Sequence, residues 1–183
     1  MPKPLCLVDT SILLNILNVP GKNECRDEVF AVFREKADAG ETFFLPLATI
    51  IETGNHIGHL PDGNERYGYA CALVREVQKA LDGTSPFVPL DLCSTEDLRQ
   101  WMNDFPHGHA VQGRGVGDMM LVGECLRLRE RHPSTEVYIW SLDSDLAEYG
   151  PFRQVLFSVV SQQFSSNKLT RRYYFANFVH IYS

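Results

Sequence analysis

Features that mark a membrane, secreted or metal-stapled protein are missing from this chain of 183 residues. No apolar run approaches the roughly 20 residues that span a bilayer. The apolar stretch before the first acid is too short for a signal peptide. The five cysteines are an odd number, widely spread and without a Cys-x-x-Cys pair. We therefore expect buried thiols in a cytoplasmic protein that contacts no membrane, rather than a disulfide or zinc framework.

The end of the chain has no acidic residue. Residues 151–183 hold four basic and eight aromatic residues, whereas the first 150 residues hold 13 basic against 23 acidic ones. This body is too acidic for a protein that grips nucleic acid over its whole surface, but a small basic surface beside an acidic pocket fits the distribution. For the tail we favour a packed final helix or strand with arginines at its rim over direct contact with RNA.

Short apolar runs alternate with stretches of helical periodicity along the chain. We expect strands at 5–8, 43–47, 87–90 and 137–140, helices at 12–17, 24–39, 48–58, 66–81 and 118–131, a further helix after Ser94, and a loop at 105–117. This alternation predicts an α/β fold with a parallel sheet and helices on both of its faces. The length suits one domain, and no internal repeat is present.

Acidic residues stand where such a sheet would place a site. Asp9 and Asp143 follow the first and last expected strands, and Glu52 and Asp118 lie near the starts of two helices. Because parallel strands end at one edge, all four carboxylates should meet there. Four carboxylates in one place repel one another and raise one another's pKa values, a conflict that a divalent cation removes. Ligands that are all oxygen select hard ions such as Mg²⁺ or Mn²⁺.

The patterns around these acids resemble those of the PIN-domain family, which includes VapC-type toxins and related PIN ribonucleases. The four matching stretches are Leu-Cys-Leu-Val-Asp9-Thr10-Ser11-Ile-Leu-Leu-Asn, Leu-Pro-Leu-Ala-Thr-Ile-Ile-Glu52, Gly-Val-Gly-Asp118-Met-Met-Leu and Ile-Trp-Ser141-Leu-Asp143-Ser-Asp145-Leu. They occur in order over positions 5–146. The resemblance implies a three-layer α/β/α fold with a central, mainly parallel sheet, forming a single PIN-like domain over residues 1–183.

The resemblance also implies a role for each site residue. Asp9, Glu52, Asp118 and Asp143 would be catalytic and hold one or two Mg²⁺ or Mn²⁺ ions, with Asp145 as an outer ligand and Thr10 and Ser141 as supporting hydroxyls. The ion would activate a water that hydrolyses an RNA phosphodiester, which makes the protein an endoribonuclease. Contacts to the RNA backbone and bases would come from Arg114, Lys168, Arg171, Arg172 and Tyr173.

Two segments depart from the family pattern. The interval between the second and third motifs is long, which predicts an insertion around 84–115, and the basic, aromatic segment 151–183 carries no motif. Two roles are equally compatible with the acids: the toxin of a toxin–antitoxin pair, with an inhibitory protein partner and a homodimer, and a housekeeping RNA-processing enzyme. The alternative function is a catalytically weak, PIN-like scaffold that binds RNA or protein, which the insertion and the tail suggest.

Each acid also has an ordinary structural explanation as a helix cap, a solvent-facing side chain or a turn residue. A rival metal site uses Glu52, His56 and His59, whose spacings of four and three place them on one helical face and suit zinc or iron. A phosphatase-like pair formed by Asp143 and Asp145 is a further interpretation. That interpretation leaves Asp9 unexplained and needs more chain after the pair than is present.

Overall fold

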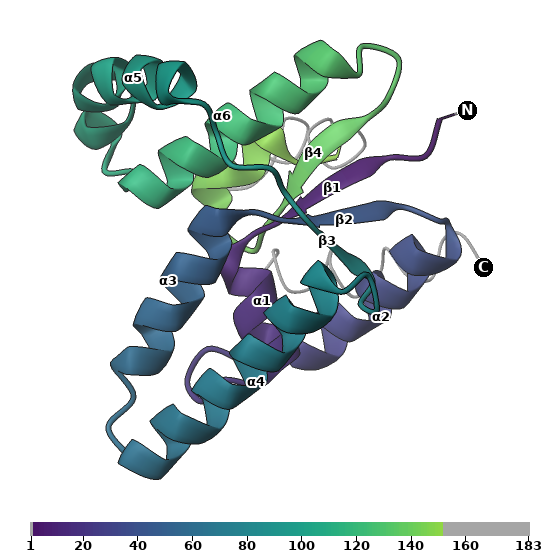
Figure 1. Ribbon diagram of the computed structural model, residues 1–183, viewed down its shortest axis with the longest axis vertical. Coiled ribbons are helices and arrows are strands. Elements are labelled where there is room, and N and C mark those ends of the chain that lie inside the picture. Colours follow the sequence, from purple (N-terminus) through teal and green to yellow (C-terminus); the bar gives the residue numbers. More distant parts are fainter. Residues whose placement is uncertain (1, 152–183) are drawn as a thin grey trace, which may run out of the picture.

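Runs of β-branched, leucine and aromatic residues form the strands of one central sheet. A computed structural model describes residues 2–151, in which four strands lie in the order β3-β2-β1-β4 and are all parallel (Figure 1). The strands are β1 (Leu5–Val8), β2 (Thr42–Leu45), β3 (Phe87–Pro89) and β4 (Val137–Trp140). This result confirms the predicted fold class, an α/β fold in three layers.

Helices connect every pair of consecutive strands. They are α1 (Thr10–Leu17), α2 (Arg26–Asp38), α3 (Leu47–Gly58), α4 (Gly63–Leu81), α5 (Thr95–Asp104) and α6 (Val116–Arg131), followed by a 3₁₀ helix, η3 (Ser144–Tyr149). Among residues 2–151, none of these helices combines the length and the apolar character needed to cross a membrane.

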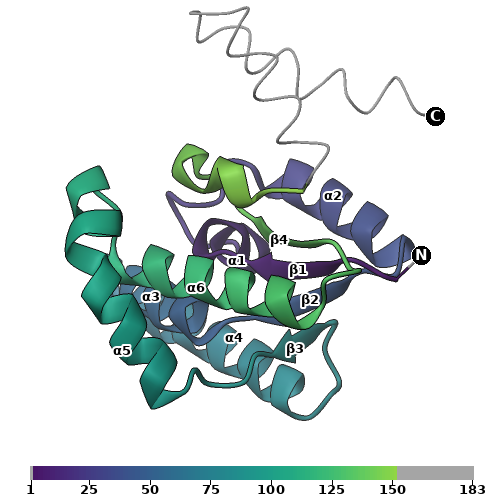
Figure 2. The ribbon, with the colours of Figure 1, turned by 90° about the horizontal axis from the view of Figure 1, so that it is seen from above.

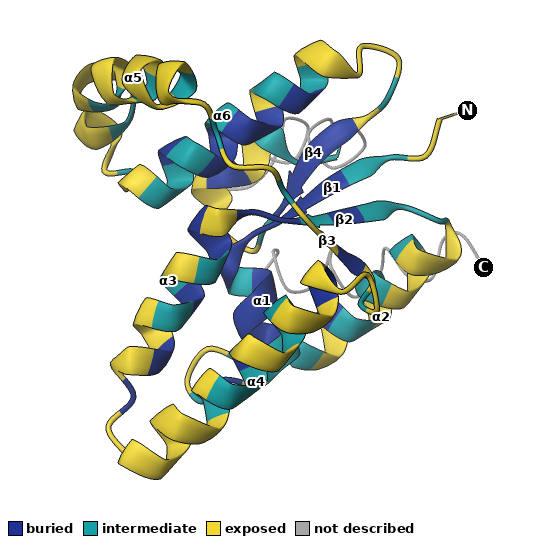
Figure 3. Ribbon diagram, viewed as in Figure 1, coloured by how far each residue is buried: buried dark blue, intermediate teal, exposed yellow. Residues whose placement is uncertain are grey.

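The strand residues alternate between two apolar layers, one on each face of the sheet. Cys6 and Val8 of β1 pack in a cluster with side chains of α1, α2 and α4, whereas Leu7 packs on the other face against α6. The same alternation places Tyr138 with the first cluster and Ile139 with the second. Figure 2 shows the helices on opposite sides of the sheet, and Figure 3 shows that the buried residues concentrate on the strands and inner helix faces. Because successive side chains of a strand point to opposite faces, the sheet packs against helices on both faces and forms the middle of three layers.

Several element boundaries differ from the sequence prediction, and two of the differences have an identifiable local reason. The second strand ends at Leu45 because Pro46, which lacks an N–H, precedes the first turn of α3. Helix α4 begins at Gly63, earlier than predicted, because the Asp62 side chain accepts hydrogen bonds from two N–H groups of its first turn. Helix α6 begins at Val116 rather than at Asp118, so Asp118 lies within its first turn.

The prediction of a loop over 105–117 is wrong for most of that segment. A single π turn (η1, Phe105–His109) and a 3₁₀ turn (η2, Ala110–Gln112) join α5 to α6. Pro106 cannot donate a backbone hydrogen bond, so the helical ladder of α5 cannot continue unchanged past it. The segment 84–115, where an insertion is predicted, contains the edge strand β3, α5 and these two turns.

Candidate active site

The sheet order places the first and last strands side by side at the point where the chain changes direction. From β1 the chain moves outward to β2 and β3, then returns to form β4 on the other side of β1. Ligand sites of open parallel sheets form at such a point, beyond the carboxyl ends of the strands. Asp9 follows β1, and its N–H donates to the carbonyl of Trp140 at 3.1 Å, which joins the two strand ends.

Two serine hydroxyls hold the carboxylate of Asp9. Ser11 Oγ and Ser141 Oγ donate to Asp9 Oδ2 at 2.6 and 2.7 Å, and the Ser11 N–H donates to the same oxygen at 3.2 Å. Each hydroxyl also accepts a backbone N–H from the segment after β4: Leu142 N–H to Ser11 at 3.0 Å and Asp143 N–H to Ser141 at 2.9 Å. We call Ser11, Ser141 and Asp9 the serine bridge, because it ties the two strand ends together.

Glu52 reaches the same edge from α3. Thr49, one turn before it, donates its hydroxyl to the carbonyl of Val8 at 2.7 Å and anchors the helix to the end of β1. The Thr10 hydroxyl donates to Glu52 Oε2 at 3.0 Å. The other side of the Glu52 carboxyl lies against Gly117 of α6. Consecutive residues of α1 therefore serve two different acids: Thr10 supports Glu52, and Ser11 supports Asp9.

Asp118 lies in the first turn of α6. Its Oδ2 accepts a hydrogen bond at 3.1 Å from the N–H of Gly115, the residue before the helix. Asp143 caps η3 by accepting the N–H of Asp145 at 2.9 Å. Both acids thus have the capping role that their sequence positions also allow, and both still face the edge that holds Asp9.

The charges of the four acids act on one another. Burial raises the pKa of Glu52, the Thr10 hydrogen bond lowers it, and the charges of Asp118 and Asp9 raise it further. Burial likewise raises the pKa of Asp118, and the charges of Asp9 and Asp143 raise it further, whereas the Gly115 N–H and the charge of Arg114 lower it. No ion pair within residues 2–151 includes any of these acids. The edge is therefore a negative site whose acids form no ion pair, with Arg114 as a cation that acts on Asp118.

The chemistry of these donors fits a hard divalent cation, because all four are carboxylates and their repulsion is what a cation would relieve. The side chains are not arranged as a finished cage, however. Within residues 2–151, no three His, Cys, Asp or Glu side chains lie in a group that could hold a metal ion as they stand. The four acids are coupled through charge, and coordination by three of them would require side-chain adjustment.

The remaining predicted residues lie in varied places. The Asp145 side chain is exposed, and its backbone carbonyl accepts a hydrogen bond from Arg114 at 2.9 Å. Arg114 also forms an ion pair with Glu148 at 2.8 Å, which holds its largely buried guanidinium at the rim of the site. The predicted RNA contacts Lys168, Arg171, Arg172 and Tyr173 lie outside the described residues.

The rival histidine site is not assembled. His59 Nδ1 lies 2.6 Å from the carbonyl of Asn55 in its own helix, and the pKa of His56 is lowered by burial, Lys22 and His59. Glu52, the third member of that set, instead bonds to Thr10.

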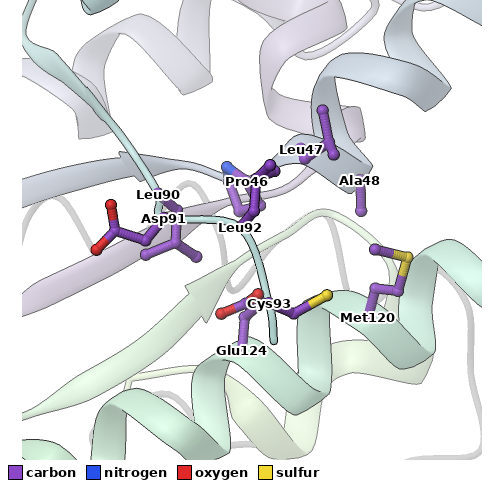
Figure 4. Close-up of a pocket in the computed structure, with 9 residues that line it drawn as sticks. All are labelled: Pro46, Leu47, Ala48, Leu90, Asp91, Leu92, Cys93, Met120 and Glu124. Carbon is purple, nitrogen blue, oxygen red and sulfur yellow. The ribbon is translucent and has the colours of Figure 1, made fainter. Parts of the chain in front are cut away.

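A small pocket lies beside the acids rather than among them. Side chains from the start of α3, the β3–α5 connection and α6 enclose about 20 Å³, which is room for roughly one water (Figure 4). Leu47, Leu92 and Met120 line this pocket. Glu124 also lines it and forms an ion pair with Arg127. The four site acids do not line it.

Sequence reasoning missed two contributors to the site. Ser11 makes the shortest hydrogen bond to Asp9, and the run of hydroxyls after that acid is its only signal. Gly117 precedes Asp118 and touches Glu52, which only the packing of α3 against α6 reveals. A scan of protein-family profiles finds no match to the chain, and a search of curated proteins finds none either.

Proposed function

We propose that the protein is a metal-dependent endoribonuclease of the PIN type, hydrolysing RNA phosphodiester bonds at the edge formed by Asp9, Glu52, Asp118 and Asp143. One observation carries the proposal. Acids from four separate segments interact through charge near the switch point of a parallel sheet, and no ion pair within the described residues includes them. Structural acids elsewhere in the protein, such as Glu124 and Glu41, have cationic partners.

Mg²⁺ or Mn²⁺ bound by these acids would supply an acidified water and neutralise charge on the scissile phosphate. The protein's own part is to hold the carboxylates in place. The serine bridge fixes Asp9, the Thr10 hydroxyl fixes Glu52, and the Gly115 N–H fixes Asp118. In the proposal, Arg114 would leave Glu148 to meet an RNA phosphate, and the exposed side chain of Asp145 would serve as an outer ligand.

The cellular setting belongs to the same proposal. All five cysteines are free thiols, which supports a reducing cytoplasm, but only Cys6 and Cys125 are buried as predicted, whereas Cys25 is exposed and Cys71 and Cys93 are partly exposed. A toxin with an inhibitory partner and a homodimeric state, or an RNA-processing enzyme, would use the same edge. The proposal also includes contacts to the RNA from Lys168, Arg171, Arg172 and Tyr173.

Cleavage of labelled single-stranded RNA tests the proposal. Activity should require Mg²⁺ or Mn²⁺, and Asp9→Asn and Asp118→Asn should each reduce it by about 100-fold, the equivalent of about 3 kcal/mol. Asp82→Asn is the matched control, because Asp82 is an exposed acid before β3, at the opposite edge of the sheet. Undiminished cleavage by both site variants would refute the assigned site.

Calorimetric titration with Mn²⁺ separates the enzyme from the scaffold alternative. The enzyme should bind Mn²⁺, and Asp9→Asn should weaken that binding while Asp82→Asn leaves it unchanged. A scaffold would bind RNA with no measurable Mn²⁺ affinity and no turnover.

A further inference from the structure

Gly117 occupies a helical position that does not need glycine for its backbone. It lies in the first turn of α6, and the glycines that adopt a positive φ are at other positions: 21, 40, 83 and 113. Glycine is less favourable than alanine inside a helix, because it loses more conformational freedom on folding. The space around the residue must therefore explain its presence.

That space is filled by the carboxyl group of Glu52. A Cβ built on Gly117 would overlap Glu52 Oε1, and would lie 2.5 Å from Cδ and 3.2 Å from Oε2. All three of these nearest atoms belong to Glu52. A methyl group at position 117 and the present position of the Glu52 carboxyl are therefore mutually exclusive.

The Glu52 carboxyl has a defined support on its other side. The Thr10 hydroxyl donates to Oε2 at 3.0 Å, so the carboxyl is held between a hydroxyl of α1 and the bare backbone of α6. In this place it interacts with the charges of Asp9 and Asp118. Because the glutamate side chain is flexible, a methyl group at 117 would move the carboxyl rather than unfold the protein.

We propose that Gly117 is a positioning residue, whose missing side chain creates the seat that holds the Glu52 carboxyl beside Asp9 and Asp118. The inference rests on the proposed function for its catalytic meaning, but the seat itself is a property of the metal-free protein. Apart from the gain in helix propensity, substitution of Gly117 should therefore act through Glu52.

A double-mutant cycle with Gly117→Ala and Glu52→Ala tests this dependence. In the wild-type background, Gly117→Ala should weaken Mn²⁺ binding about tenfold, as loss of an outer support does at other metal sites. In the Glu52→Ala background the same change should leave the remaining Mn²⁺ affinity unaltered. An equal loss in both backgrounds would overturn the proposal, because Gly117 would then act on something other than Glu52.

Thermal unfolding of the metal-free protein gives a second readout. Gly117→Ala should be more stabilising in the Glu52→Ala background than in the wild-type background, where it also breaks the Thr10 hydrogen bond. Gly68→Ala is the matched control: Gly68 lies in α4 with no atom near its missing Cβ, so its effect should be the same in both backgrounds. Additive effects of Gly117→Ala and Glu52→Ala would overturn the seat, as would failure of the double variant to fold.

The two readouts separate this inference from the proposed function. If the wild-type protein binds no Mn²⁺ and cleaves no RNA but the unfolding cycle is non-additive, the seat stands and the nuclease proposal fails. If Mn²⁺ binds and both cycles are additive, the nuclease proposal stands and Gly117 has no positioning role.

Discussion

Removal of one hydroxyl of the serine bridge has a cost that the structure allows us to work out. In Ser141→Ala, Asp9 loses a donor at 2.7 Å, and the N–H of Asp143 loses its acceptor at 2.9 Å. A hydrogen bond to a charged group contributes about 1.5–3 kcal/mol, and a neutral one about 0.5–1.5 kcal/mol. Because Asp143 is exposed, water can replace the second bond. We therefore expect a loss of about 2 kcal/mol, or about 4–8 °C in Tm for a chain of this size.

Urea unfolding of the metal-free protein at neutral pH, followed by circular dichroism, measures this loss. Ser144→Ala is the control, since Ser144 is exposed, next to the site, and outside the bridge. Ser11→Ala should cost a similar amount, and the double variant less than the sum, because both hydroxyls donate to the same oxygen. A change in Ser141→Ala within about 0.5 kcal/mol of wild type would refute the bridge as a stabilising contact.

Three further perturbations test other parts of the structure. Burial and neighbouring acids raise the pKa of Glu52 and Asp118 above 4.5 and 3.8, so the folded protein holds these protons more tightly than the unfolded chain. Stability of the metal-free protein should therefore fall as pH rises through the raised pKa values, and urea midpoints of Glu52→Gln should show a weaker decline. Gly123→Ala should displace Trp101, whose Nε1 would lie 2.5 Å from the new Cβ, at a cost of about 1–3 kcal/mol; unchanged hydrogen exchange in α5 would contradict this. Tyr138→Phe should cost about 1–3 kcal/mol in urea unfolding, because the Tyr138 hydroxyl bonds to both Lys36 and Glu41, whose side chains are largely buried. An unchanged free energy of unfolding would show that Lys36 and Glu41 pair equally well without it.

The layers of the fold could be predicted because strand periodicity carries the information locally. The run at 5–8 is apolar at every position, as expected for a strand covered on both faces, and it became β1 with the same bounds. Local chemistry also sets the starts of helices: Asp62 caps α4, which the predicted helix at 66–81 does not take into account. The order of the strands was not predictable from such signals, since β1 pairs with β4 across most of the chain.

Part of the candidate site could likewise be predicted from the sequence, and part could not. Asp9, Asp118 and Asp143 could be proposed because each follows a strand or opens a helix, and parallel strands bring such positions to one edge, whereas Glu52 lies in the middle of α3. The supporting contacts depend on side chains from distant segments. The Ser11 hydroxyl accepts the N–H of Leu142, and the Glu52 carboxyl packs against Gly117. The run of hydroxyls after Asp9 is the only local signal for the first contact, and the second has none. Which acid lies beside which hydroxyl follows from the packing of α1, α3 and α6, a property of the complete fold.

The positions of the cationic side chains determine how far the charge of the acidic edge is neutralised. Lys36 is largely buried and pairs with Glu41, before β2 and so on the amino-terminal side of the sheet, while Arg114 at the rim of the site pairs with Glu148. Both cations are thus paired with acids outside the site, and the charge of Arg114 in addition lowers the pKa of Asp118 and relieves part of the repulsion among the site acids. The hydroxyls and the glycine instead hold the carboxylates together against that repulsion. Under the proposed function, such an arrangement stabilises the protein poorly by itself, and a cation bound from solution would relieve the remaining repulsion.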